Sequence, residues 1–206
     1  IFFNLYKRME SYINSFSPYD LKARQCNSLD EYKKIINTNI ISANLNKIHD
    51  CIEIAEKKLK ACTLINYSLM DRFIWKFLFT TNLVENGFPF TCEDIIYIPI
   101  EILNNHTKYN MIKLLIHERI HIFQRYFPTE ANKYILSLGY QLYKKNNIVL
   151  RRANPDIDNF IYILGNKLTG AYYTSINPKN INDVIQHCEY EHPYEHMAYV
   201  LSDLLM

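Results

Sequence analysis

Two histidines and a glutamate at residues 117–121 have the spacing needed to hold a metal ion and activate a water molecule. The stretch reads His-Glu-Arg-Ile-His, an H-E-x-x-H motif. On an α-helix, residues i and i+4 lie on the same face, so His117 and His121 can bind one zinc ion together. Glu118 lies about 100° around the helix from His117, where its carboxylate can act as general base toward a metal-bound water. The motif therefore predicts metal-assisted hydrolysis.

The residues around this motif predict the helix that the chemistry requires. No Gly or Pro interrupts the stretch, and Pro128 follows shortly after it. We expect a helix over about residues 108–126. The plain alternative is a buried helix whose histidines and glutamate make ordinary hydrogen bonds and ion pairs, although a charged Glu there is costly without a partner. The apolar residues at helical spacing around the motif are Leu114, Leu115, Ile116, Ile120, Ile122 and Phe123.

A catalytic zinc ion takes three protein ligands and keeps one position for water, so the motif needs a third ligand. Residues 187–199 hold three of the seven histidines of the chain and three glutamates. Pro193 suits the first turn of a helix, which places Glu195 in that turn. A carboxylate on a buried helix face is costly unless a zinc ion compensates its charge, so Glu195 is the first candidate for the third ligand. The stripe that marks this face continues from Glu195 through Ala198, Tyr199, Ser202 and Leu205.

Two alternatives for the third ligand stay open. Glu191 stands four residues before Glu195, and in this variant Glu191 binds the ion while Glu195 supports it by hydrogen bonding. A histidine of the same segment is the second alternative: His187, His192 or His196.

Together, the motif and the segment Pro193–Tyr199 resemble the gluzincin branch of zinc metallopeptidases, in which the third ligand is a Glu on a later helix. The resemblance covers about residues 90–206. It implies zinc as the cofactor, a peptide or protein as the substrate, and hydrolysis of peptide bonds by a metal-activated water. The residues that it assigns are His117, His121 and Glu195 as metal ligands and Glu118 as general base.

The chain departs from related patterns at two positions. Many gluzincins have an Asp four residues after the ligand Glu, whereas this chain has Tyr199. The metzincin pattern H-E-x-x-H-x-x-G-x-x-H fails at Gln124. The chain also resembles small HExxH proteins of large DNA viruses, which implies a viral protein that associates with the virion.

Peptide hydrolysis develops negative charge on the carbonyl oxygen, and a hydrogen-bond donor must stabilise that charge. Gluzincin-like enzymes use a His or a Tyr for this. The candidates here are His192, Tyr190 and Tyr173, and the plain alternative for each is packing or a structural hydrogen bond.

Hydrophobic spacing predicts the elements that must position these residues. A hairpin or edge strand is expected over residues 94–102, just before the motif, and a substrate main chain can pair along such a strand. Two short antiparallel strands are expected at 159–164 and 170–174, joined through Gly165 and Asn166. The single tryptophan, Trp75, is expected in the core. The further helices are expected over about residues 44–65, 68–79, 129–145 and 193–205.

These elements predict an α+β fold that is mainly helical and zincin-like, with an active-site helix, a small antiparallel sheet and a C-terminal ligand-bearing helix. We expect a helical N-terminal section over residues 1–80, irregular with short helices up to residue 40, and a zincin-like metallopeptidase core over 81–206. At 206 residues the two are expected to form one compact domain. The chain begins with Ile, so we expect it to start inside a longer product.

Composition excludes several other classes of protein. The net charge is only +2 and the Lys and Arg residues are spread along the chain, so no nucleic-acid partner is expected. Only four glycines occur, and they form no phosphate-binding motif. No apolar run reaches about 18 residues, so no membrane segment is expected. The five cysteines form no C-x-x-C pair, which favours reduced thiols in the cytoplasm or another reducing compartment.

Two further readings stay open beside hydrolysis. Aromatic residues make up 14% of the chain, and an aromatic-rich N-terminal section suits contacts with assembly partners. The chain would then be a non-catalytic structural or assembly protein, for example a virion component, in which zinc is only a staple. In the last interpretation, the N-terminal section is a pro-segment that inhibits the metallopeptidase core.

Overall fold

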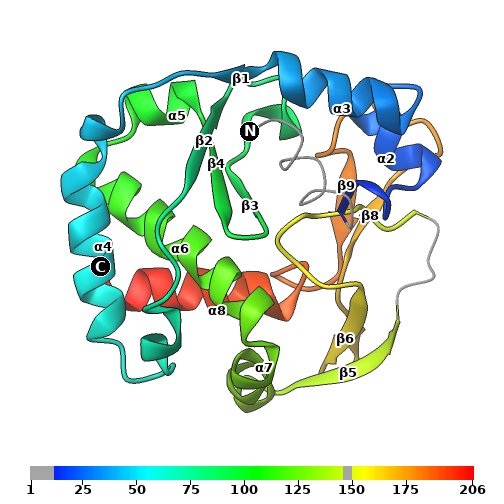
Figure 1. Ribbon diagram of the computed structural model, residues 1–206. Helices are drawn as coiled ribbons and strands as arrows, with labels where there is room; N and C mark the ends of the chain where they lie inside the picture. The colour runs from blue at the N-terminus through cyan, green and yellow to red at the C-terminus, as the bar shows by residue number, and fades with distance from the viewer. Residues whose placement is uncertain (1–11, 146–149) are drawn as a thin grey trace.

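The helix that carries the H-E-x-x-H motif is packed between two other helices (Figure 1). In the computed structural model, which describes residues 12–145 and 150–206, this helix is α6 and spans Lys108–Tyr126, as predicted. It contacts α4 (His49–Lys60) and the C-terminal helix α8 (Pro193–Leu204). The ligand-bearing segments of the sequence therefore meet in space.

Local sequence signals explain where α6 begins and ends. The Thr107 hydroxyl accepts a hydrogen bond from the Asn110 backbone N–H over 3.2 Å and so caps the first turn. The helix ends at Phe127, directly before Pro128, which is the first residue of α7 (Pro128–Ser137). Five apolar side chains between these ends are completely buried: Leu115, Ile116, Ile120, Ile122 and Phe123.

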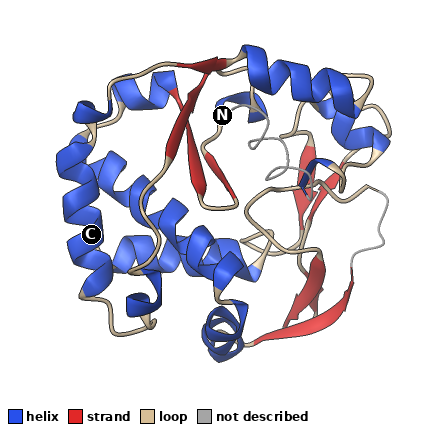
Figure 2. Cartoon of the chain, viewed as in Figure 1, coloured by secondary structure: helices blue, strands red, loops and turns tan. Residues whose placement is uncertain are grey.

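The described residues form an α+β fold in which helices predominate, as Figure 2 shows. The C-terminal helix begins at Pro193, as the sequence predicts, and α4 confirms the main part of the helix predicted over residues 44–65. No helix in this part of the chain is long and apolar enough to cross a membrane. The remaining α-helices are α2 (Pro18–Ala23), α3 (Leu29–Thr38) and α5 (Ile100–Asn105), and 3-10 turns lie at Leu45–Lys47, Tyr67–Met70 and Glu85–Gly87.

The largest sheet precedes α6 and has the strand order β1-β2-β4-β3. β2 runs parallel to β4, whereas β1 and β3 are antiparallel to their neighbours. The sequence predicts a small antiparallel sheet; the two smaller sheets are antiparallel, whereas this largest sheet is mixed because β2 pairs with β4 in parallel. β3 forms one edge of this sheet and contacts α6 (Figure 1). The strand bounds are Ile40–Ile41, Phe77–Thr80, Phe90–Cys92 and Ile95–Pro99 for β1 to β4.

Two smaller antiparallel sheets follow. The prediction that residues 159–164 pair with 170–174 is wrong, although both strands exist. Gly165, with a φ of 61°, turns the chain back directly after β6, so β7 pairs with β6 and β8 is left to pair with β9. The first of these sheets has the strands β5 (Tyr140–Lys145), β6 (Phe160–Leu164) and β7 (Lys167–Leu168), and the second has β8 (Ala171–Tyr173) and β9 (Val184–Gln186).

Two predicted helices are corrected by the structure. Over residues 68–79 the chain forms a 3-10 turn and then strand β2, because the apolar residues at its end pair with β4. Over residues 129–145 helix α7 ends at Ser137. Gly139 adopts a φ of 88°, which a helix does not allow, and the chain continues as β5.

The face of α6 around Arg119 anchors the segment before β2. Arg119 is only 1% exposed, and its Nε donates a hydrogen bond to the Tyr67 hydroxyl over 3.2 Å. Its guanidinium also donates to the Phe73 carbonyl and lies 4.7 Å from the centroid of the Trp75 ring. Trp75 is half-buried against the main core, and its indole N–H donates to Glu56 over 3.0 Å. These contacts hold α6 against the segment that precedes β2.

The N-terminal helices share a second core with the edge of the main sheet. In this core the rings of Phe90 and Tyr97 stack with centroids 4.5 Å apart and planes at 7°. Tyr32 and Ile36 of α3 are buried against the same cluster. Segments far apart in the sequence, α2–α3 and β3–β4, are therefore held together beside the motif helix.

Candidate metal centre

Three nitrogen and oxygen atoms from α6 and α8 meet at one point. The Nε2 atoms of His117 and His121 lie 3.0 Å apart, and Glu195 Oε2 lies 3.5 Å from the first and 3.7 Å from the second. Among the residues that the structure describes, these three are the only group of His, Cys, Asp and Glu side chains whose candidate donor atoms all lie within 4.8 Å of one another. The three residues predicted as ligands are therefore brought together as a group that could hold a metal ion.

The spacing of the three donor atoms fits a tetrahedral zinc site. Ligand atoms at about 2.0–2.1 Å from zinc stand roughly 3.3 Å apart in a tetrahedron. The observed separations of 3.0, 3.5 and 3.7 Å surround that value. Two imidazole nitrogens and one carboxylate oxygen are also the donor set of many catalytic zinc sites, which keep the fourth position open. His117 and Glu195 are each 13% exposed and line a cleft, whereas His121 is 1% exposed.

Gln124 sets which nitrogen of His121 faces the centre. The Gln124 side-chain N–H donates to the Tyr194 carbonyl over 2.8 Å, so its Oε1 is the atom that lies 2.8 Å from His121 Nδ1. Nδ1 must then carry the proton and donate it, which leaves Nε2 with a lone pair directed at the centre. The same amide therefore joins α6 to α8 and prepares His121 as a ligand.

The protonation states suit metal binding. Burial lowers the pKa of His121 to about 3, so the ring is neutral at neutral pH. Burial alone would raise the pKa of Glu195, but the two histidines and a hydrogen bond from Asn154 outweigh it and hold the pKa well below its ordinary value. His121 thus offers a neutral imidazole and Glu195 a carboxylate. These are the forms that bind zinc.

Glu118 lies in the wall of the cleft and is only 2% exposed. Burial raises the pKa of Glu118 well above its ordinary value, and the carboxylates of Asp156 and Glu195 raise it further. Its Oε2 has no hydrogen-bond partner among the described residues. A basic carboxylate with a free oxygen suits proton transfer from water, and a dication at the neighbouring ligands would favour its ionised form.

A cleft of about 800 Å³ lies at the candidate metal centre, and His117 and Glu195 line it. Its walls come from α6 and α8, from the segment 88–90 that leads into β3, and from the loop 152–156. Arg24, the C-cap residue of α2, also lines it, so the N-terminal section contributes to the cleft wall. The cleft is large enough for several residues of an extended peptide.

Thr91, the middle residue of the edge strand β3, cannot pair with a substrate strand. The Thr91 backbone N–H donates to Asp156 Oδ1 over 2.7 Å, and the Arg125 guanidinium donates to the Thr91 carbonyl over 3.4 Å. Both main-chain groups that Thr91 would offer to a substrate strand are therefore occupied. The part of this edge that faces the cleft consists of Phe88, Pro89 and Phe90.

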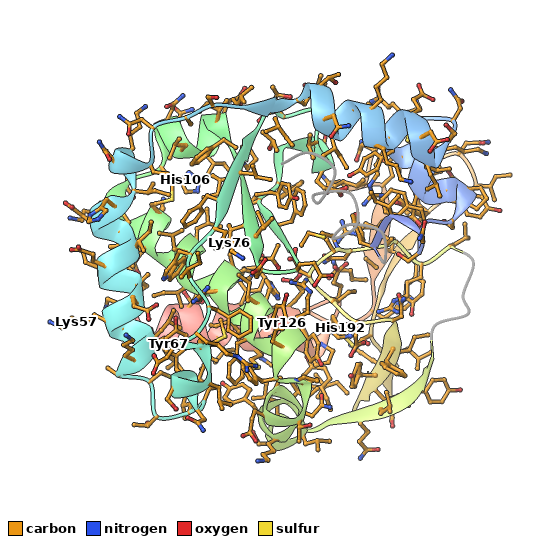
Figure 3. The ribbon with its side chains drawn as sticks, viewed as in Figure 1. Lys57, Tyr67, Lys76, His106, Tyr126 and His192 are labelled. Carbon is orange, nitrogen blue, oxygen red and sulfur yellow. The ribbon has the colours of Figure 1, made fainter. Side chains whose placement is uncertain are left out.

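Two of the predicted oxyanion donors lie away from the cleft. His192, labelled in Figure 3, is completely buried and caps α8: its Nδ1 accepts from the Tyr194 N–H over 3.1 Å, and its Nε2 donates to Asp158 over 3.0 Å. Tyr173 is 2% exposed, and its hydroxyl donates to Asp20 over 3.0 Å. Both side chains have structural partners, and neither lines the cleft.

The other predicted residues lie nearer the centre. Tyr190 lines the cleft and stacks on His196, with ring centroids 4.3 Å apart and planes at 8°. Glu191 also lines the cleft, but Arg152 and Asn154 bind its carboxylate oxygens. No described contact joins Glu191 to the two motif histidines.

Sequence reasoning missed four residues that shape this site. Asn154 and Arg152 contact Glu191, and Arg24 lines the cleft, yet all three come from segments with no recognisable motif. Gln124 could have been recognised from the sequence, because it stands three residues after His121 on the same helix. Nothing in the sequence marks its partner on α8, the Tyr194 carbonyl.

Comparison with protein-family models, with curated proteins and with solved structures gives no significant match to this chain.

Proposed function

We propose that the chain is a zinc-dependent peptidase of the gluzincin type, with a zincin-like fold in which α6 is the active-site helix and α8 bears the third ligand. The observation that carries this proposal is the convergence of His117, His121 and Glu195 within 4.8 Å at a cleft whose wall contains Glu118. The proposed substrate is a peptide or protein, because the cleft is long enough for an extended chain and mixes apolar with polar walls.

A bound zinc ion would supply a Lewis acid that polarises the substrate carbonyl and lowers the pKa of a water molecule. The side chains perform the remaining steps. Glu118 takes one proton from the attacking water while the water oxygen bonds to the carbonyl carbon. When the C–N bond breaks, the same proton passes from Glu118 to the leaving nitrogen. One water is consumed, and one carboxylic acid and one amine are formed.

The state of the cysteines supports a reducing compartment as part of the proposal. All five cysteines are free, and three of them are buried. Free buried thiols persist where the thiol pool is reduced, as in the cytoplasm. A place in a virion, which the resemblance to viral HExxH proteins implies, is compatible with the same chemistry.

The proposal is tested on the full chain by metal analysis followed by a casein digest. We expect about one zinc per chain, cleavage of casein, loss of cleavage with a chelator, and recovery when zinc is returned. His121→Ala should lose both zinc and cleavage, whereas His49→Ala, at an exposed position on α4, should lose neither. Zinc bound at His121 without any cleavage would overturn the peptidase proposal and favour a structural or assembly protein.

A further inference from the structure

Tyr199 lies against the candidate metal centre. It stands one helical turn after Glu195 on α8, so the two side chains project from the same face of the helix. Its ring meets the ring of His117 with centroids 4.5 Å apart and planes at 66°. Tyr199 also lines the cleft, as do Glu118 and Glu195. The sequence predicts this position on a buried face, yet the side chain is 45% exposed because that face opens into the cleft.

The Tyr199 ring contacts two other rings while its hydroxyl stays available. Besides His117 it contacts Tyr190, with ring centroids 5.6 Å apart, and Tyr190 in turn stacks on His196. No hydrogen bond joins the Tyr199 hydroxyl to another side chain in the described part of the chain, and the Ser202 hydroxyl donates to the Tyr199 backbone carbonyl instead. A fixed ring with a free hydroxyl is a preorganised donor, which needs no reorganisation when negative charge develops nearby.

Tyr199 shares the cleft with three carboxylates. Glu118, Glu191 and Glu195 line the same cleft as Tyr199. Burial raises the pKa of Tyr199 to about 12, and these carboxylates contribute to the rise. Because its ring contacts His117 and lines the cleft together with Glu118 and Glu195, the Tyr199 side chain stands at the candidate metal centre.

We propose that Tyr199 stabilises the oxyanion in the proposed peptidase reaction. Its hydroxyl donates a hydrogen bond to the substrate carbonyl oxygen as water attacks the carbonyl carbon and negative charge moves onto that oxygen. No proton leaves Tyr199 in this step. The assignment rests on the proposed function and supplies the donor that neither His192 nor Tyr173 can provide from its buried position.

The test compares two zinc-binding ligands on the zinc-loaded full chain. A phosphinic Phe–Ala dipeptide has a tetrahedral group whose second oxygen mimics the oxyanion, whereas a mercaptoacetyl dipeptide with the same side chains binds zinc through sulfur and lacks that oxygen. Tyr199→Phe keeps the ring and removes the hydroxyl. By calorimetry, Tyr199→Phe should weaken the phosphinic ligand by on the order of 10²-fold, the scale of losing one oxyanion donor, and should leave the thiol ligand unchanged.

Tyr109→Phe is the control, because it removes a hydroxyl from an exposed tyrosine of α6 that does not line the cleft, and it should change neither affinity. If Tyr199→Phe weakens the binding of both ligands equally, Tyr199 acts only by packing and the assignment is overturned. No change with the phosphinic ligand, or no binding of it to the zinc-loaded wild type, would overturn it as well. If the hydroxyl-dependent binding is found but casein is not cleaved, the peptidase proposal fails while the oxyanion site at Tyr199 stands.

Discussion

The Asn154 side-chain amide donates a hydrogen bond to Glu195 Oε1 over 3.1 Å and leaves the second oxygen of that carboxylate facing the two motif histidines. The same amide nitrogen donates to Glu191 Oε1, and the other Glu191 oxygen accepts from Arg152. Among the contacts of the described residues, Asn154 is thus the link between Glu191 and the candidate metal centre. This relationship separates the two glutamates that the sequence leaves as competing ligands.

We predict that Glu195→Gln weakens zinc binding far more than Glu191→Gln. The first change removes a donor atom and its charge from the centre, whereas the second changes a group that acts through Asn154. The expected losses are several hundred-fold or more for Glu195→Gln and at most about 10–100-fold for Glu191→Gln, the usual range for a residue behind the ligands. Competition with a chromogenic chelator measures both. The reverse ranking would make Glu191 the ligand.

A second prediction concerns Gln124, which joins His121 to the Tyr194 carbonyl. Gln124→Leu should weaken zinc binding by about 10–100-fold, because His121 loses the partner that fixes its tautomer. It should also lower the free energy of unfolding by about 1–3 kcal/mol, since buried polar groups on α6 and α8 lose their partners. Zinc titration and urea unfolding measure the two effects. Gln141→Leu, at an exposed position on β5, is the control, and an unchanged zinc affinity in Gln124→Leu would show that His121 is oriented by packing alone.

The parts of this structure that follow from short-range rules are the parts that could be predicted from the sequence. The helix at Lys108–Tyr126 follows from helical spacing, a Thr cap and a closing Pro, all within one stretch. The position of Glu195 follows from Pro193, which sets the first turn of α8. Because i and i+4 lie on one helix face, the pair of histidines needed no tertiary information either.

The remaining features depend on contacts between distant residues, and the sequence carries no local sign of them. Residues 68–79 have helical spacing, yet their end becomes strand β2 because β4 lies beside it and pairs with it. Gln124 and Tyr194 are 70 residues apart, and Asn154 and Glu195 are 41 apart. Such partners are chosen by packing. Local propensity cannot identify them, whereas the candidate ligands His117 and His121 follow from their spacing on one helix.

A third prediction concerns the buried ion pair that fixes the N-terminal helices to the cleft wall. Arg24 binds Glu85 through two hydrogen bonds of 2.9 and 2.7 Å, and both side chains are under 5% exposed. Arg24→Met should lower the free energy of unfolding by about 3–5 kcal/mol, because it leaves a buried carboxylate without its partner. The double variant Arg24→Met with Glu85→Gln should lose less, since it removes the charge of the buried Glu85 carboxylate, and Asp20 is then the one carboxylate that loses an ion pair with Arg24. Urea unfolding at neutral pH compares them, and an equal or larger loss in the double variant would contradict the pairing argument.

The same pair predicts a dependence of stability on pH. Burial alone would raise the pKa of Glu85, but the Arg24 guanidinium outweighs it and holds the pKa below its ordinary value of 4.5. A carboxyl whose folded pKa is lowered contributes stability above its unfolded pKa, and that contribution is lost as the pH falls through the folded pKa. Wild type should therefore lose stability below about pH 4.5, and Glu85→Gln should lose less over the same range. Parallel acid-unfolding curves for the two proteins would contradict this assignment.

The last prediction separates metal binding from catalysis at Glu118. Its carboxylate is buried, its pKa is raised, and one of its oxygens has no partner, so it is poised to accept a proton and contributes little to the stability of the fold. Glu118→Gln keeps the size of the side chain and removes its basicity. Zinc content should stay near one per chain, and the free energy of unfolding of the metal-free protein should stay level or rise, because a neutral amide is easier to bury than a carboxylate. Casein cleavage should fall by roughly 10²-fold or more, the usual scale for loss of a general base. Loss of zinc in this variant would make Glu118 a ligand, and cleavage at the wild-type rate would show that the base lies elsewhere.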